Sequence, residues 1–252
     1  MSAFRLRTRA AAALALGLGA SLALPAIAAQ FALSNTRIHL DPARATETVV
    51  LTNQEARAVT FEVHAKRWTQ TADGEWQLAP TQDLVVHPLI LRMPAEGEAR
   101  LRVGTLSPTV TTEQTYRLEL QELPDGSKAK AGEVRLLTTT SLPVFVQVPG
   151  AESKLALAVK SVDASGLSMW LSNSGTAYAA PNEAKLRVLD KNGKTVHDSL
   201  LSTGYVLSGS RIPVRATLPA AACARAAKIE LTFERTAPLV ASVDPGSRKC
   251  AP

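Results

Sequence analysis

Apolar and polar residues alternate with a period of two along most of the chain. In the stretch 59–66, for example, Val59 and Phe61 fall on one side of an extended chain and their polar neighbours on the other. The stretches 98–103 and 116–121 repeat this alternation. A period of two is typical of a β-strand with one face buried and one face open.

Pairs of turn-forming residues separate these predicted strands. They are Asp73-Gly74, Glu96-Gly97, Asp125-Gly126, Ser174-Gly175 and Asn192-Gly193. Such pairs favour tight turns between antiparallel strands. An alanine-rich patch at 220–227 has helical character, but it is too short to change the class. The pattern therefore predicts an all-β protein with two immunoglobulin-like β-sandwich domains.

The first 29 residues have the form of a secretory signal peptide. Three arginines precede an apolar run at 10–24, and Ala26-Ile27-Ala28 provides a cleavage pattern of small residues. We therefore expect cleavage after Ala28 or Ala29 and export of the remaining chain. A membrane anchor is the alternative, but the apolar run is short and no stop-transfer pattern follows it.

Pro149-Gly150 marks a predicted domain boundary near the middle of the remaining chain. It closes a long strand-like run, and a new alternating pattern begins at Leu155. Proline and glycine together favour a break between structural units. We therefore expect an N-terminal domain at 30–150 and a C-terminal domain at 151–252.

The charge of the chain argues against nucleic acid as a partner. The chain has 28 basic and 22 acidic residues, and three of the basic residues belong to the predicted signal peptide. The remaining chain therefore has a formal net charge of +3, and it contains no long run of Lys or Arg. Such a small excess is typical of an ordinary protein surface.

Cys223 and Cys250 are the two cysteines of the chain, and both belong to the second predicted domain. In an oxidising compartment such a pair indicates a disulfide, which would close a loop of about 28 residues. Two free buried thiols are the alternative. A metal site is disfavoured because the sequence has no Cys-x-x-Cys motif and no histidine near either cysteine.

The sequence contains no catalytic constellation. Its histidines are scattered singly, at His39, His64, His87 and His197. Motifs of hydrolases, metalloproteases, P-loop proteins and dinucleotide-binding proteins are absent from the chain after the signal peptide. The sequence therefore predicts no catalytic residue, metal, cofactor or small-molecule substrate, and we expect a protein that is not an enzyme.

Six segments of the chain carry a family resemblance. They are 33–40, 48–53, 88–103, 116–124, 134–146 and 171–179. In this order they resemble the periplasmic chaperones of pilus assembly through the chaperone–usher route, over nearly all of the chain after the signal peptide. The sequence Ser-Leu-Pro-Val-Phe at 141–145 is similar to that of the archaic or alternative branch of this family.

The resemblance implies two immunoglobulin-like domains in an L-shaped, boomerang-like arrangement. It implies a periplasmic chaperone that stabilises pilin or fimbrial subunits by donor-strand complementation and delivers them to an outer-membrane usher. In this mechanism an exposed edge strand completes a subunit sandwich that lacks its last strand. The side chains predicted to enter the subunit groove are Val134, Leu136, Thr138 and Thr140. Chaperones of this kind sometimes hide the strand by self-association when unloaded.

The resemblance also implies roles for two charged residues. Arg37 matches a basic residue that binds the terminal carboxylate of the subunit through charge-assisted hydrogen bonds; a solvated strand arginine is the alternative. The second basic anchor of the family would fall near 140–143, where no basic residue stands. Glu113 matches an acidic residue that links the domains through an arginine, but Gln147 occupies that position, so the bridge cannot form as such.

Two other functions stay open at this point. One is a secreted immunoglobulin-like adhesion or carbohydrate-binding module, with Trp68, Trp76 and Trp170 as a sugar-stacking platform. Because Trp68 and Trp76 flank a predicted hairpin turn, cross-strand packing accounts for them better. The other is a periplasmic hydrolase, for which no titratable residue is a candidate.

Overall fold

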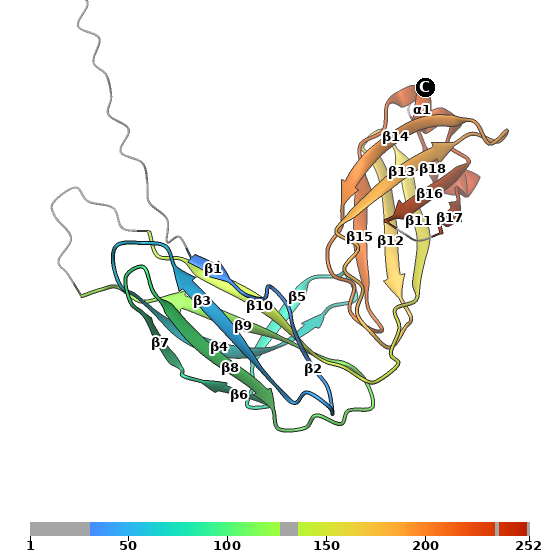
Figure 1. Ribbon diagram of the computed structural model, residues 1–252. Helices are drawn as coiled ribbons and strands as arrows, with labels where there is room; N and C mark the ends of the chain where they lie inside the picture. Colours follow the sequence, from blue (N-terminus) through green and yellow to red (C-terminus); the bar gives the residue numbers. More distant parts are fainter. Residues whose placement is uncertain (1–30, 127–135, 235–236, 251–252) are drawn as a thin grey trace, which may run out of the picture.

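The computed structural model describes residues 31–126, 136–234 and 237–250. The predicted signal peptide and Val134 of the predicted donor strand lie outside these residues. Strands make up most of the described chain, which confirms the all-β class. In Figure 1 the strands form two lobes that meet at one end and are inclined to each other.

The N-terminal lobe contains the strands between residues 31 and 146. They are β1 (Phe31–Leu33), β2 (Ile38–Leu40), β3 (Thr46–Asn53), β4 (Val59–Gln70), β5 (Trp76–Pro80), β6 (Leu84–His87), β7 (Ile90–Met93), β8 (Glu98–Thr105), β9 (Gln114–Glu122) and β10 (Thr139–Val146). One sheet has the order β1-β3-β8-β6, and the other has the order β2-β10-β9-β4-β5 with β7 also paired to β4. Their inner faces enclose a core that includes Leu51, Phe61 and Leu101. The lobe is therefore a β-sandwich.

The C-terminal lobe repeats this architecture between residues 155 and 250. Its elements are β11 (Leu155–Asp163), β12 (Gly166–Asn173), β13 (Glu183–Leu189), β14 (Thr195–Ser202), β15 (Arg211–Ala216), α1 (Ala220–Arg225), β16 (Lys228–Phe233), β17 (Leu239–Ser242), the 3-10 turn η1 (Pro245–Ser247) and β18 (Arg248–Lys249). The sheets have the orders β15-β12-β11-β18 and β14-β13-β16-β17. Among the described residues, no helix has the length and apolar character needed to cross a membrane.

The segment 33–40, which resembles the opening strand of the chaperone family, is divided between two sheets. β1 pairs antiparallel with β3, whereas β2 pairs parallel with β10 in the other sheet. A bend at 34–37 separates β1 from β2, and its Asn35 side chain donates a hydrogen bond to Glu47. Ser and Asn favour such bends because their side chains bond to nearby polar groups. Arg37 therefore lies in a bend and not within a strand.

β4 and β5 form a long hairpin that reaches the C-terminal lobe. Its turn contains the predicted Asp73-Gly74 pair, and Gly74 has a φ of 85°. A Cβ atom at Gly74 would lie 2.7 Å from a ring carbon of Pro213 and 2.9 Å from the Cα of Ile212. Glycine therefore permits both the turn and the close approach of the two lobes.

A disulfide joins Cys223 of α1 to Cys250, as predicted. The Cα atoms lie 5.8 Å apart, and the residues are 27 positions apart in the sequence. Cys223 is buried in the core of the C-terminal lobe, so the bond ties the end of the described chain to that core.

We predict that replacing both cysteines by serine lowers the free energy of unfolding of the C-terminal lobe. Opening a loop of this length costs roughly 3–4 kcal/mol, because the unfolded chain regains conformational freedom. Urea unfolding followed by circular dichroism measures the change, and reduced wild-type protein is the matched control. A loss well below about 1 kcal/mol would show that the bond adds little to this sandwich.

Candidate functional site

An aromatic cluster fills the junction between the two lobes. Trp68 and Phe145 of the N-terminal lobe are fully buried there with Leu207 of the C-terminal lobe. The rings of Phe145 and Tyr178 stack 3.6 Å apart with an angle of 9°, and Trp68 meets Tyr205 edge to face at 5.2 Å. Phe145 belongs to β10 and Trp68 to β4, so the sheet with the predicted donor strand forms one wall of the junction.

Side-chain to backbone hydrogen bonds also hold the lobes together. The Gln70 side chain donates to the Tyr205 carbonyl at 2.8 Å and accepts from the Leu207 amide at 2.9 Å. Arg211 Nε donates to the Ala72 carbonyl at 2.8 Å. The hairpin of β4 and β5 therefore contacts the C-terminal lobe at several fixed points.

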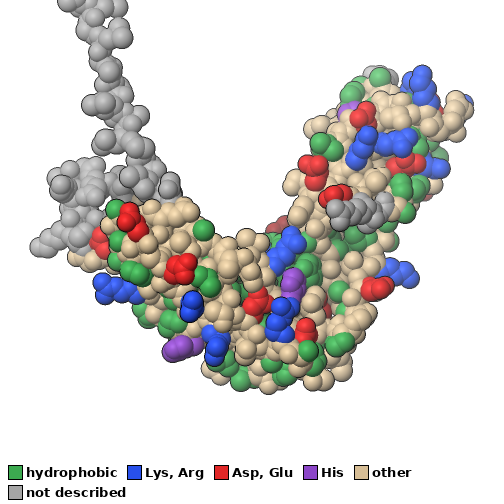
Figure 2. Space-filling model, viewed as in Figure 1, with side chains coloured by type: hydrophobic (Ala, Val, Ile, Leu, Met, Phe, Trp, Pro, Cys, Tyr) green, Lys and Arg blue, Asp and Glu red, His purple; other side chains and the backbone are tan. Residues whose placement is uncertain are grey.

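Arg37, the predicted carboxylate anchor, lies at the edge of this junction. Its Nε donates to the Tyr205 hydroxyl at 2.9 Å, and its guanidinium carbon lies 5.5 Å from the centre of the Tyr205 ring. Arg37 and Tyr178 line a hollow of about 790 Å³ that extends over the C-terminal lobe. Figure 2 shows a wide opening between the two lobes, with Lys and Arg side chains near the place where the lobes meet. In the described part of the chain, no carboxylate forms an ion pair with Arg37.

Arg117 on β9 is a second cation at the junction. It is only 4% exposed, and its guanidinium carbon lies 4.1 Å from the ring centres of both Trp68 and Trp76 and 5.4 Å from that of Tyr205. One nitrogen, Nη1, donates to the Ser141 carbonyl at 3.4 Å. Among the described residues, Nε and Nη2 have no hydrogen-bond partner. Burial lowers the pKa of Arg117 below its ordinary value.

Sequence reasoning missed Arg117. Its alternation with Tyr116 and Leu118 placed it correctly on the outer face of β9, where an arginine is normally solvated. Its burial arises from the two tryptophans on β4 and β5 and from Tyr205 on the other lobe. A signal was present in the sequence, because tryptophans on neighbouring strands can cover a cation on the same face of a sheet.

The predicted donor strand is partly described. β10 begins at Thr139, so Leu136 and Thr138 precede it, while Thr140 lies within it. Leu136 is 56% exposed. Thr138 is held at the start of the strand, because its amide donates to the Glu122 carboxylate at 3.0 Å and its carbonyl accepts from the Glu122 amide at 2.9 Å.

β10 has one fully paired edge and one partly open edge. It pairs with β9 from Thr139 to Val146, but with β2 only from Val144 to Val146. Because the Glu122 amide bonds to the Thr138 carbonyl, the backbone groups of even-numbered residues point toward β9. Those of Thr139, Ser141 and Pro143 therefore point toward the open edge, and no described strand pairs with them.

Glu113 joins the lobes without an arginine partner. Its carboxylate accepts a hydrogen bond from the Tyr178 amide of the C-terminal lobe at 2.7 Å. Burial raises the pKa of Glu113 to about 7, although hydrogen bonds from the Tyr178 amide and the Gln147 side chain oppose the shift. Uncharged hydrogen-bond donors therefore replace the ion pair with an arginine, which cannot form because Gln147 occupies the arginine's position. The contact between the lobes is retained.

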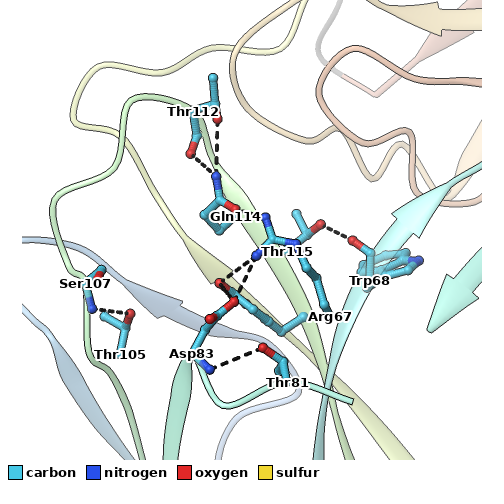
Figure 3. Close-up of polar contacts among 10 residues, drawn as sticks. Arg67, Trp68, Thr81, Asp83, Thr105, Ser107, Thr112, Gln114 and Thr115 are labelled. Atoms are coloured by element: carbon cyan, nitrogen blue, oxygen red, sulfur yellow. Dashed lines mark hydrogen bonds and ion pairs between the residues drawn. The ribbon is translucent and has the colours of Figure 1, made fainter. Parts of the chain in front are cut away.

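A polar network fixes the start of β9, next to Glu113. In Figure 3, Arg67 forms an ion pair with Asp83 at 2.9 Å, and it also donates to the Gln114 side chain. The Thr115 hydroxyl donates to the Trp68 carbonyl at 2.6 Å. These contacts hold two consecutive positions, Gln114 and Thr115, so Glu113 just before them and Arg117 just after them have defined places.

The three tryptophans do not form a sugar-stacking platform. Trp68 is fully buried and packs against Trp76 at 4.7 Å, which is the cross-strand packing that the sequence suggested. Trp170 belongs to the C-terminal lobe, where the Arg211 guanidinium carbon lies 4.3 Å from its ring centre. No continuous aromatic surface joins the three rings.

The fold is that of a protein with two packed immunoglobulin-like β-sandwiches. Residues 30–151 match the family of pili and flagellar-assembly chaperones through its PapD N-terminal domain. The N-terminal lobe therefore belongs to this chaperone family, as the sequence resemblance predicted. This family consists of assembly chaperones, which supports the prediction that the chain is not an enzyme. A search of curated proteins by sequence finds no match.

Solved structures of chaperones have the same fold. The CsuC–CsuE chaperone–tip adhesin complex of the archaic Csu pili of Acinetobacter baumannii is 18% identical, with a TM-score of 0.58, over 84% of this chain and 98% of that chain. The class 5 fimbriae chaperone CfaA is 11% identical, with a TM-score of 0.56, over 86% and 100%. The Salmonella enterica SafA pilin complex with the SafB chaperone is 15% identical, with a TM-score of 0.54, over 86% and 98%. At these identities the likeness shows the fold.

We predict that the protein becomes less stable as the pH rises from about 4.5 to about 7. In the folded protein burial raises the pKa of Glu113 to about 7, whereas the ordinary pKa of this carboxyl is 4.5. The folded state therefore binds more protons in this window, so its stability is greatest below the window and falls across it. Glu113→Gln should flatten this part of the profile, measured as the urea midpoint at a series of pH values.

Glu98→Gln is the matched control for this prediction. Glu98 is an exposed carboxylate on β8, in the sheet that does not contain β4, β9 or β10. The control should keep the slope of the wild-type profile. Equal slopes for Glu113→Gln and wild type would show that Glu113 does not govern the pH dependence.

Proposed function

We propose that the protein is a periplasmic chaperone that binds pilin or fimbrial subunits by donor-strand complementation and passes them to an outer-membrane usher. The open edge of β10 carries the proposal. Thr139 to Pro143 are paired on one side only, so they offer backbone hydrogen bonds to an added strand. A solvent-exposed strand edge normally promotes aggregation, so proteins tend to cover it. A protein that donates a strand needs such an edge to be open.

Exposed apolar side chains next to this edge support the same function. Leu136 and Leu137 are both largely exposed immediately before β10. A subunit that lacks its last strand exposes an apolar groove, and burying a leucine there contributes about 1.5–3 kcal/mol. We propose that Leu136, Thr138 and Thr140 enter this groove, together with Val134 from outside the described residues.

The two arginines at the junction support binding of the subunit's terminal carboxylate. Arg37 and Arg117 approach the same ring, Tyr205, and in the described chain neither forms an ion pair. The free Nε and Nη2 of Arg117 lie along one edge of its planar guanidinium, which is the edge that matches two carboxylate oxygens. We propose Arg37 as the predicted anchor and Arg117 as the second basic group, in place of the one missing near 140–143.

The relatives support the class of partner. One similar structure is described as a chaperone–tip adhesin pre-assembly complex and another as a pilin in complex with its chaperone. We propose pilin subunits as partners of this chain on these grounds. Delivery to an usher, export by the signal peptide, the domain boundary at Pro149-Gly150, the L-shaped arrangement and self-association of the unloaded form remain predictions.

Co-expression with pilin subunits from neighbouring reading frames tests the proposed function. We expect a one-to-one complex to purify from the periplasm. Arg37→Ala should weaken it roughly ten- to a hundred-fold, because charge-assisted hydrogen bonds to the carboxylate are lost. Leu136→Asp should weaken it at least about tenfold, because a charge would enter an apolar groove.

Two variants are matched controls for these substitutions. Arg92→Ala removes an exposed arginine on β7, and Leu106→Asp replaces an exposed leucine outside the donor strand. Both should leave the yield of the complex unchanged. A folded protein that forms no complex with any exported subunit would contradict the proposed function. If Leu136→Asp loses the complex and Arg37→Ala keeps it, strand donation stands and Arg37 is not the carboxylate anchor.

A further inference from the structure

The Arg117 site is closed in the structure, although it has the donors that a carboxylate needs. Arg117 is almost fully buried, and its Nε and Nη2 have no partner among the described residues. The indole Nε1 of Trp68, which is in ring contact with Arg117, is likewise buried and without a partner. Three unsatisfied donors without an acceptor indicate a site for an anion with several lone pairs.

Trp76 is the ring that covers this site most loosely. Its centre lies 4.1 Å from the Arg117 guanidinium carbon and 4.7 Å from the Trp68 ring centre, and the two indoles are inclined at 60°. Trp76 is 49% exposed, whereas Trp68 is fully buried in the junction cluster. The Arg117 guanidinium therefore lies between two inclined indole rings, the buried ring of Trp68 and the half-exposed ring of Trp76.

The position of Trp76 in the fold allows it to move. It is the first residue of β5, an exposed edge strand whose sheet neighbour is β4. Trp76 belongs to neither hydrophobic core cluster, so turning its side chain toward solvent would uncover Arg117 and the face of Trp68 that it contacts and leave the core of the sandwich closed. A cation–π contact is weaker than a bidentate charge-assisted pair, so an arriving carboxylate can replace the ring.

We propose that Trp76 is a displaceable cover over a carboxylate site formed by Arg117 and the Trp68 indole N–H. In the unloaded protein Trp76 shields the cation from solvent and from small anions. A carboxylate held at the end of a strand along β10 displaces it, because Arg117 contacts Ser141 on the open stretch of that strand. The inference rests on the proposed function, since the carboxylate is the C-terminus of a subunit.

Fluorine NMR of protein labelled with 5-fluorotryptophan tests this cover. The probe is a short peptide of alternating valine and serine with N-terminal lysines and a free C-terminal carboxylate, and the same peptide with a C-terminal amide is its control. Signals are assigned with Trp76→Phe and Trp170→Phe. The acid peptide should move the Trp76 signal to the position of a solvent-exposed ring and leave that of Trp170 unchanged. The amide should bind at least about tenfold more weakly and move neither signal.

Two variants separate the cover from the site beneath it. Trp76→Ala should bind the acid peptide roughly two- to thirty-fold more tightly, because the contact with Arg117 no longer has to be broken. Arg117→Gln should lose the preference for acid over amide. Urea unfolding of each variant shows whether it is folded.

The outcomes distinguish this inference from the proposed function. A Trp76 signal that stays fixed when the acid peptide binds would overturn the proposal that Trp76 is a displaceable cover. Weaker binding of the acid peptide by folded Trp76→Ala would overturn it as well. If acid and amide bind equally while co-expressed subunits are still captured, the cover fails and strand donation stands. If no subunit is captured but the acid peptide moves the Trp76 signal, the covered carboxylate site stands without strand donation.

Discussion

The stacking of Phe145 on Tyr178 is the contact on which the geometry of the junction depends. Phe145 lies on β10, and Tyr178 belongs to the other lobe. The rings are almost parallel at 3.6 Å; Phe145 is buried with Trp68 and Tyr178 packs partly buried against them, so the contact combines aromatic packing with the removal of apolar surface from water. It couples the strand with the open edge to the position of the second lobe. A movement between the lobes would therefore alter the strand and the basic site together.

The charged groups of the junction are held by neutral partners. Arg37 and Arg117 contact aromatic rings and hydroxyl or carbonyl oxygens, while Glu113 accepts from an amide of the backbone. Pairing a buried arginine with a carboxylate of the same chain would satisfy it permanently. Aromatic faces compensate its charge only in part, so an external anion can still gain energy by binding. The arrangement thus keeps the folded chain stable and leaves its cations available.

Local patterns predicted much of the fold, whereas contacts between distant segments escaped them. The alternation at 59–66 identified β4 because a strand's period is a local property. The division of 33–40 between two sheets was missed because it depends on which strands lie alongside. Arg37 came from the family resemblance. Arg117 could not be recognised in the same way, because rings from two other strands and the opposite lobe create its burial.

Pro143 sets the end of the open edge of β10. Its backbone faces the open edge but has no N–H to donate, and β2 occupies that edge from the next residue onward. An added strand can therefore pair along β10 only as far as Pro143. In the sheet register, Pro143 lies opposite Arg117. If a partner strand pairs along β10 as proposed, the fold sets the point at which that strand must end, because a chain that continued past this point would bring an ordinary peptide group, not a carboxylate, to the cation.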